Sequence, residues 1–488
     1  MKRCIGFLLA LTFLLAGCGN KSCKQHTDEN KNDICDRCGS SVVIIVDFYC
    51  INDLHGRILD SAVQPGVDEM TAYLQQAAKT DDHILLLSAG DMWQGSAESN
   101  LTKGRLVTEW MNTLDFQAMA LGNHEFDWGE SYVRENAQLA DFPFLAINVY
   151  DAQTRAPADY CEPSRLVDCG GVQIGLIGAI GDCHSSIAPD MAQDFYFLTG
   201  RDLTELVKAE STALREQGAD FIVYLLHDGG GTADSTLSAY YDEALSDGYV
   251  DLVFEGHTHQ RYLTEDAFGV VHLQNGGDNT GGLSHVEIAV HAIDGTVTLR
   301  TAELVNSAVY EAMEDAPVIA DLIQQYDKEL SPAFASFGTL NTSVPGDDLR
   351  QLVADLYYME GLVNWGAEYD IVMGGGYISI RSPGYLARGE VTYRELLELF
   401  PFDNELVLCS IRGRDLIDRF LESDNRNYFI SCSENLAENI DENGIYYVVV
   451  DSYSSTYGPN RLTEIERYGE SYYARDMLAN YILNGGLR

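Results

Sequence analysis

From residue 42 onward, short apolar runs alternate with longer segments of mixed polarity. The runs are rich in β-branched residues, which predicts strands, whereas segments such as 69–78 and 203–215 have the spacing of amphipathic helices. This alternation is typical of a layered α/β fold. The predicted strands are residues 42–48, 84–87, 116–121, 144–147, 172–177, 221–226 and 250–254.

Five of the predicted strands run directly into short polar clusters, at residues 52–56, 90–91, 122–124, 227–229 and 256–259. Functional groups in layered α/β folds gather at the carboxyl ends of strands, so we expect these clusters to meet. An Asp-x-His pair taken alone is typical of a solvated turn, and only the ordered set of five indicates a site. The candidate ligands in the clusters are Asp53, His55, Asp91, Asn123, His227, His257 and His259.

Seven such side chains, with one carboxylate able to bridge, are what two divalent cations about 3.5–4 Å apart require. We assign Asp91 as the bridge because it lies second in chain order. Mixed imidazole and oxygen ligands suit Zn²⁺, Mn²⁺, Fe²⁺ or Co²⁺, and the sequence does not choose among these ions and Mg²⁺. We expect one ion to be held by Asp53, His55, Asp91 and His259, and the other by Asp91, Asn123, His227 and His257.

His124 directly follows the predicted ligand Asn123, and Asp127 lies three positions further on. A carboxylate beside an imidazole fixes its tautomer and raises its basicity. The pair is therefore predicted to present an oriented imidazole with raised basicity. Glu125 and Phe126, which lie between them, are predicted to have structural roles, with Phe126 packing beneath the site.

The N-terminus has the pattern of a targeting segment. Lys2 and Arg3 precede the apolar run 5–15, which is too short to span a bilayer. The following Leu-Ala-Gly-Cys sequence at 15–18 resembles a bacterial lipobox. We therefore expect residues 1–18 to be a lipoprotein signal that ends in a lipidated Cys18, which would tether the protein outside the cytoplasmic membrane. An ordinary secretory signal is the alternative.

Residues 19–41 are polar and contain two close pairs of soft metal ligands. Their spacing fits a small tetrahedral zinc site, formed by Cys23, His26, Cys35 and Cys38. One alternative is a flexible tether with two disulfides. Another is an oxygen-rich calcium loop, which lacks the glycine and terminal glutamate of an EF-hand and would use Asp28, Asn30, Asn32 and Asp33.

The other cysteines fall into two groups. Cys161 and Cys169 lie eight positions apart in a loop-like stretch and could form a disulfide outside the cell. The remainder are expected to be buried or free, and they are Cys50, Cys183, Cys409 and Cys432.

The chain has 488 residues and a formal net charge of −44. This length indicates two to three domains. The charge argues against nucleic acid as a partner, because phosphates would be repelled. A phosphate-bearing substrate would instead need local positive charge, which metal ions provide. We expect a catalytic domain at 42–315, a linker helix at 316–332 and a second domain at 333–488.

Five motifs occur in order along the chain: Asp53-x-His55-Gly56, Gly90-Asp91-x-x-Gln94-Gly95-Ser96, the hexapeptide 122–127, His227, and Gly256-His257-x-His259. Together they resemble the calcineurin-like metallophosphoesterases, and more narrowly the secreted 5′-nucleotidase group, which also hydrolyses UDP-sugars and 2′,3′-cyclic nucleotides. The resemblance implies an α/β (α+β) fold, with a four-layer β-sandwich flanked by helices and a smaller α/β nucleotide-binding domain. It also implies that metal-activated water attacks phosphorus. His124 would stabilise the transferring phosphoryl group or assist the leaving oxygen, with Asp127 orienting it.

The resemblance further implies that the second domain holds the nucleoside. Met373 stands in place of the family's usual asparagine, three extra residues precede Arg381, and the late aromatic segment has no clear aspartate. The Pro-Phe-Asp-Asn turn at 401–404 matches well. Two aromatic rings would sandwich a flat base, although a core role for Phe402 is the alternative. The implied substrate-binding residues are Gly375, Gly376, Arg381, Phe402, Asn404, Tyr453 and Tyr457.

Three functions are compatible with these patterns. The first is a lipid-anchored dimetal 5′-nucleotidase or 2′,3′-cyclic phosphodiesterase. The second is a hydrolase of UDP-sugars or of non-nucleotide phosphoesters, for which the change at Met373 is the only support in the sequence. The third is a surface binding protein without catalysis, which the complete ligand set disfavours. The sequence does not indicate an oligomeric state.

Overall fold

The computed structural model describes residues 27–29, 31, 33–34, 36–37, 41–60, 65–232, 235–238, 241–277, 280–422, 427–456, 462–469 and 471–487. The predicted lipidation and zinc ligands, Cys18, Cys23, His26, Cys35 and Cys38, lie outside these residues, as does Tyr457. Among the described residues, every helix is too short or too polar to cross a membrane.

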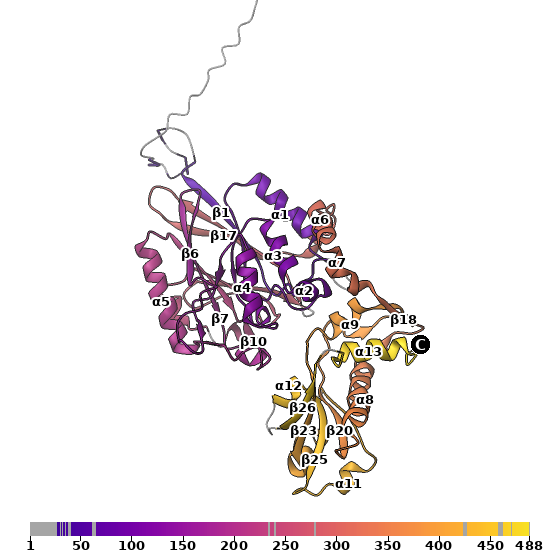
Figure 1. Ribbon diagram of the computed structural model, residues 1–488. Coiled ribbons are helices and arrows are strands. Elements are labelled where there is room, and N and C mark those ends of the chain that lie inside the picture. The colour runs from indigo at the N-terminus through magenta and orange to yellow at the C-terminus, as the bar shows by residue number, and fades with distance from the viewer. Residues whose placement is uncertain are drawn as a thin grey trace, which may run out of the picture.

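Two β-sheets form the centre of the first domain (Figure 1). The six-stranded sheet has the order β17-β16-β1-β2-β3-β4, and its strands are β1 (Val43–Ile51), β2 (Ile84–Ser88), β3 (Phe116–Ala120), β4 (Phe144–Leu145), β16 (Leu283–His291) and β17 (Val297–Leu304). The seven-stranded sheet has the order β13-β14-β12-β9-β7-β6, with β15 paired to β14. Its strands are β6 (Ser164–Cys169), β7 (Val172–Ile180), β9 (Phe221–His227), β12 (Leu252–Glu255), β13 (Arg261–Glu265), β14 (Val271–Gly277) and β15 (Thr280–Gly281).

The two sheets pack face to face through side chains that alternate along their strands. Val46 and Leu87 of the first sheet share one core with Leu225 and Phe254 of the second. Along each strand, the alternate side chains that point away from this shared core are also apolar, and helices cover them on the outer face of each sheet. Helices α1 (Asp68–Thr80), α3 (Arg105–Asn112), α4 (Glu130–Leu139) and α6 (Pro317–Gln325) cover the first sheet, and α5 (Gly200–Glu216) covers the second. The expected four-layer arrangement is confirmed.

The second domain is built on a five-stranded sheet of order β24-β20-β25-β23-β26. Helices α8 (Gly346–Trp365), α9 (Tyr393–Leu399) and α13 (Ala474–Leu483) pack against one of its faces. Met373 lies on the other face, fully buried beside Val407 and Val448. The strands are β20 (Ile371–Tyr377), β23 (Leu406–Arg412), β24 (Tyr428–Cys432), β25 (Ile445–Asp451) and β26 (Thr463–Tyr468).

The disulfide considered for Cys161 and Cys169 does not form, and both thiols are free. The reason is local geometry. Strand β6 occupies most of the segment between them, and an extended chain rises about 3.3 Å per residue. The two sulfur atoms are therefore held well beyond bonding reach, which requires Cα atoms within about 7 Å. Cys50, Cys183 and Cys409 are buried and free as expected, and Cys432 is exposed.

Replacing His285 should destabilise the protein more at low pH than at high pH. The ring stacks on Tyr49 at 4.5 Å and bonds the carboxylates of Asp47 (2.6 Å) and Glu303 (3.1 Å). Burial opposes the charged ring, but these two hydrogen bonds raise the pKa of His285 above its ordinary value. A raised pKa contributes stability that is complete below the unfolded value of about 6.5 and disappears as the pH rises through the folded value.

A His285→Gln variant should thus lose roughly 1–2 kcal/mol of unfolding free energy at pH 5.5, and less at pH 9. Urea unfolding at several pH values measures this difference. The matched control is His291→Gln, whose carboxylate partner Asp294 is exposed. A destabilisation by His285→Gln that stays constant with pH would contradict the expectation.

Candidate dimetal site

The five polar clusters meet at one edge of the sandwich because of strand direction. Strands β1, β2 and β3 run parallel in the first sheet, and β9 and β12 run parallel in the second. Each chain leaves its strand through a sharp turn. Five of the seven predicted ligands have left-handed backbone, with φ of +51° at Asp53, +51° at His55, +54° at Asp91, +73° at His257 and +52° at His259. Non-glycine residues rarely adopt this conformation, and such strain concentrates at functional sites.

The predicted ligands form two groups of three, in which the possible ligand atoms lie within 4.8 Å of one another. The first group is Asp53, His55 and His259, and the second is Asp91, His227 and His257. Asn123 joins the second group, since its Oδ1 lies 2.8 Å from His257 Nδ1 and 3.3 Å from His227 Nε2. These groups match the division expected from the sequence. The assignment of Asp91 as a bridge between them stays a prediction.

The ring contacts fit a bound cation. In the first group, Nε2 of His55 and Nε2 of His259 face each other at 2.9 Å. His55 donates its other ring N–H to the carbonyl of Gln94 at 2.8 Å, which leaves its Nε2 as a lone pair. His227 donates in the same way from Nδ1 to the carbonyl of Ala89 at 2.8 Å. Outer hydrogen bonds of this kind fix the tautomer of metal-binding histidines, and a neutral ring with a free Nε2 lone pair, as at His55, is the form that binds a cation.

Electrostatics within the groups also favour metal binding. Burial, reinforced by His227, lowers the pKa of His257 to about 4, and burial with nearby Arg381 lowers that of His259 to about 3. Both rings are therefore neutral near pH 7, as metal coordination requires. Burial would also lower the pKa of His227, but the Asp91 carboxylate 3.1 Å away raises it to about 10. A cation bound between His227 and Asp91 would take the place of the proton that these two side chains share in its absence.

Glu125 holds the loops that carry two of the ligands. Its buried carboxylate accepts backbone N–H groups from Asp91 (2.9 Å), Met92 (2.8 Å), Trp93 (3.2 Å) and Gly122 (2.7 Å). It therefore joins the turn after β2 to the turn after β3. Glu125 thus has a structural role, which is to hold these two turns together. Phe126 packs in the core beneath the site, and its ring lies 4.4 Å from the ring of Phe195.

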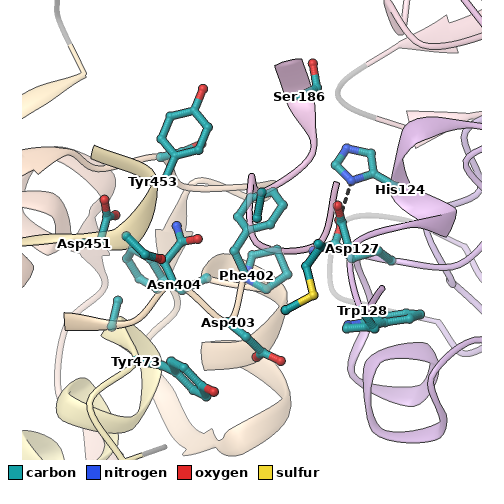
Figure 2. Close-up of a pocket in the computed structure, with 18 of the residues that line it drawn as sticks. His124, Asp127, Trp128, Ser186, Phe402, Asp403, Asn404, Asp451, Tyr453 and Tyr473 are labelled. Carbon is teal, nitrogen blue, oxygen red and sulfur yellow. Dashed lines mark hydrogen bonds and ion pairs between the residues drawn. The ribbon is translucent and has the colours of Figure 1, made fainter. Parts of the chain in front are cut away.

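His124 and Asp127 point toward each other at the cavity edge (Figure 2). His124 Nδ1 lies 2.6 Å from Asp127 Oδ2, and Arg381 of the second domain donates from Nη2 to His124 Nε2 at 3.0 Å. Burial would lower the pKa of His124, but the Asp127 carboxylate raises it above its ordinary value. The guanidinium of Arg381 also lies 5.4 Å above the Phe402 ring. A cation and an oriented imidazole thus converge beside the ligand groups.

A cavity of about 780 Å³ lies between the two domains. Figure 2 shows Tyr453, Asn404 and Phe402 on one side of it, with His124, Asp127 and Trp128 on the other. The turn that carries Phe402 is held across the domain boundary. Asn100, in helix α2 (Ala97–Thr102), donates from Nδ2 to the carbonyl of Pro401 at 2.9 Å. Lys103 pairs with Asp403 at 3.5 Å.

Most of the substrate-binding residues implied by resemblance line this cavity, namely Arg381, Phe402, Asn404 and Tyr453. Gly375 and Gly376 are not among the lining residues. Their left-handed φ values of +123° and +149° and close packing show another reason for glycine, since a Cβ at Gly375 would lie 2.2 Å from the carbonyl oxygen of Phe429. Met373 lies in the core and not in the cavity. Lining residues for which the sequence suggested no role include Gln94, Lys103, Trp128, Tyr377 and Asp451.

Comparison with known proteins agrees with this geometry. Residues 46–261 match the calcineurin-like phosphoesterase family. The chain is 24% identical over 410 residues to protein UshA of Yersinia enterocolitica, covering 75% of this chain and 72% of UshA. It is 25% identical over 433 residues to the 2′,3′-cyclic-nucleotide 2′-phosphodiesterase/3′-nucleotidase of Salmonella typhimurium, covering 75% and 66%. The crystal structure of a 5′-nucleotidase precursor from Thermus thermophilus superposes with a TM-score of 0.68 at 18% identity, covering 91% and 97%.

The protein therefore contains a calcineurin-like phosphoesterase domain followed by a second, C-terminal domain. It is a metal-dependent hydrolase of phosphoric esters. Enzymes of this family use two divalent metal ions, and the two ligand groups described above are the candidates for holding them.

Proposed function

We propose that the protein is an extracytoplasmic hydrolase of phosphoester bonds in nucleotides, as a 5′-nucleotidase, a 2′,3′-cyclic phosphodiesterase or both. The observation that carries this proposal is the shared cavity. His257 and His259 of the ligand groups line the same space as Phe402 and Tyr453. An aromatic platform beside a dimetal centre suits a substrate with a flat base at one end and a phosphate at the other.

The residues of the site would have separate roles in such a reaction. Asp53, His55 and His259 would hold one ion, while Asp91, Asn123, His227 and His257 would hold the other. Two divalent ions supply the Lewis acidity and activated water that attack on phosphorus requires. Arg381, which reaches His124 from the second domain, would bind phosphoryl oxygens. When Arg381 turns from His124 Nε2 to the phosphoryl oxygens, His124, oriented by Asp127, would carry a proton on that nitrogen for the leaving oxygen.

A substrate panel tests the proposal. Metal-depleted protein would be assayed with AMP, UMP, 2′,3′-cyclic AMP, UDP-glucose and glycerol phosphate, before and after addition of Mn²⁺, Zn²⁺, Co²⁺, Fe²⁺ or Mg²⁺. We expect metal-dependent hydrolysis of at least one nucleotide, measured as phosphate release from AMP and UMP and as ring opening of 2′,3′-cyclic AMP to a monophosphate. An absence of metal-dependent turnover on all three nucleotides would contradict the proposal, and elemental analysis of the purified protein would identify the bound metals.

A Phe402→Ala variant sharpens this test. If Phe402 stacks on a base, its loss should lower kcat/KM for AMP by about 5- to 50-fold and leave glycerol phosphate nearly unaffected. Phe268→Ala, which removes an exposed ring, is the control. Equal losses on both substrates would instead assign Phe402 to packing.

A larger substrate is the second candidate, and one observation favours it. The cavity shares Trp128, Asp190 and Met191 with an adjoining depression of about 580 Å³. A UDP-sugar could place its second group there. Preferential hydrolysis of UDP-glucose over AMP in the same panel would support this alternative.

We also propose a lipid anchor at Cys18, based on the signal-like sequence of residues 1–18. The predicted zinc knuckle at 19–41 remains a second proposal for the same region. Continued membrane association of a Cys18→Ala variant would contradict the anchor.

A further inference from the structure

Gln94 presents an unusual combination of burial and unmet hydrogen bonding. The residue is 1% exposed, and neither side-chain amide atom has a hydrogen-bond partner among the residues that the structure describes. Buried amides are almost always hydrogen-bonded, because leaving one unpaired costs free energy. Gln94 also lines the cavity between the domains. The cavity is therefore where a partner for this amide can be supplied.

The backbone of Gln94 places it at the phosphate end of the cavity. Its carbonyl accepts the Nδ1–H of His55 at 2.8 Å, so the residue directly adjoins the first ligand group. The aromatic residues proposed for the base come from the second domain. Asn123 repeats the pattern at the second ligand group, where Oδ1 faces His227 and His257 but Nδ2 has no hydrogen-bond partner in the described part of the chain. Each ligand group is thus accompanied by one unpaired amide N–H group.

We propose that the side-chain amide of Gln94 donates an N–H to a non-bridging oxygen of the substrate's phosphoryl group, a role that rests on the phosphoester hydrolysis proposed above. A phosphoryl group offers only acceptors, and an amide nitrogen offers two donors. The amide is uncharged, so it can bind an anion without competing with the cations for the carboxylate ligands. Hydrogen bonds to charged groups are stronger than neutral ones.

The test compares two substitutions in the full, metal-loaded chain. Gln94→Met keeps the length of the side chain and removes its hydrogen bonds, and Gln94→Glu replaces the donors with a negative charge. Gln173→Met is the control, because Gln173 lies at the amino end of β7, at the opposite end of the strand from the site. The measurements are kcat/KM for AMP, the dissociation constant of inorganic phosphate by calorimetry, and the metal content.

We expect Gln94→Met to lower kcat/KM and weaken phosphate binding by about 10- to 100-fold each. Gln94→Glu should lose more, because its charge repels the phosphate. Both variants should keep their metals, since the backbone carbonyl that orients His55 is unchanged. If kcat/KM and the phosphate dissociation constant of Gln94→Met both lie within twofold of wild type, the proposal is overturned. Water alone would then be the hydrogen-bond partner of the Gln94 amide.

Two further outcomes separate this role from others. A loss of metal in step with the loss of activity would show that Gln94 acts only on the ligand group, which also overturns the proposal. If the wild-type protein hydrolyses no nucleotide, the proposed function fails on its own. The binding of inorganic phosphate to the metal-loaded variants then still decides the role of Gln94.

Discussion

An Asp91→Asn variant should lose about a thousandfold or more of kcat/KM for any phosphoester that the protein hydrolyses. Asp91 contacts His227 at 3.1 Å and accepts the backbone N–H of His124 at 2.8 Å, so it joins the second ligand group to His124. Asparagine keeps the shape but removes the charge. Each metal ion contributes several kcal/mol to stabilising the transition state, and 1.36 kcal/mol corresponds to tenfold in rate.

The same variant should bind less than two metal ions per chain at micromolar metal, which elemental analysis measures after dialysis. Asp220→Asn is the matched control, because Asp220 is a hydrogen-bonding carboxylate just before β9, at the opposite end of the sheet. That control should keep both metals and its activity within twofold. An Asp91→Asn protein with full activity and two metals would show that the centre lies elsewhere.

The candidate ligand groups could be predicted from the sequence because the direction of the strands largely determines where these side chains lie. Parallel strands end at the same edge of a sheet, so polar residues after β1, β2, β3, β9 and β12 had to meet. The two groups of candidate ligands in the structure have the membership expected for the two ions. The left-handed backbone at five ligands was not predictable, because Asp and His rarely adopt it without tertiary support.

The sequence was less informative about the cavity. The contact of Arg381 with His124 joins residues 257 positions apart, and that of Asn100 with Pro401 joins residues 301 apart. Neither contact leaves a periodic pattern along the chain. Met373 looked like a change in the substrate pocket, yet its strand turns that side chain into the core. The unmet hydrogen bonds of Gln94 likewise become visible only when every neighbour has a position.

A His124→Ala variant is expected to lose about 10²- to 10⁴-fold in kcat, the range for loss of a general acid or base. KM and metal content should change little, because His124 is not in either ligand group. Asp127→Asn should lose less, since the imidazole remains but its tautomer is no longer fixed by the 2.6 Å contact. His83→Ala, one residue before β2 at the opposite end of that strand, is the control. Unchanged activity of His124→Ala would remove this residue from the mechanism.

The choice of leaving group then decides what His124 does. If its Nε2 gives a proton to the departing oxygen, the loss should be large for AMP, whose alkoxide leaves poorly. It should be small for p-nitrophenyl phosphate, whose phenolate leaves without help. If His124 instead stabilises the transferring phosphoryl group, both substrates should lose equally. Arg381 makes the comparison informative, because its guanidinium already lies 3.0 Å from Nε2 and can neutralise phosphoryl charge but cannot donate a proton at neutral pH. A leaving-group-dependent loss therefore assigns proton transfer to His124.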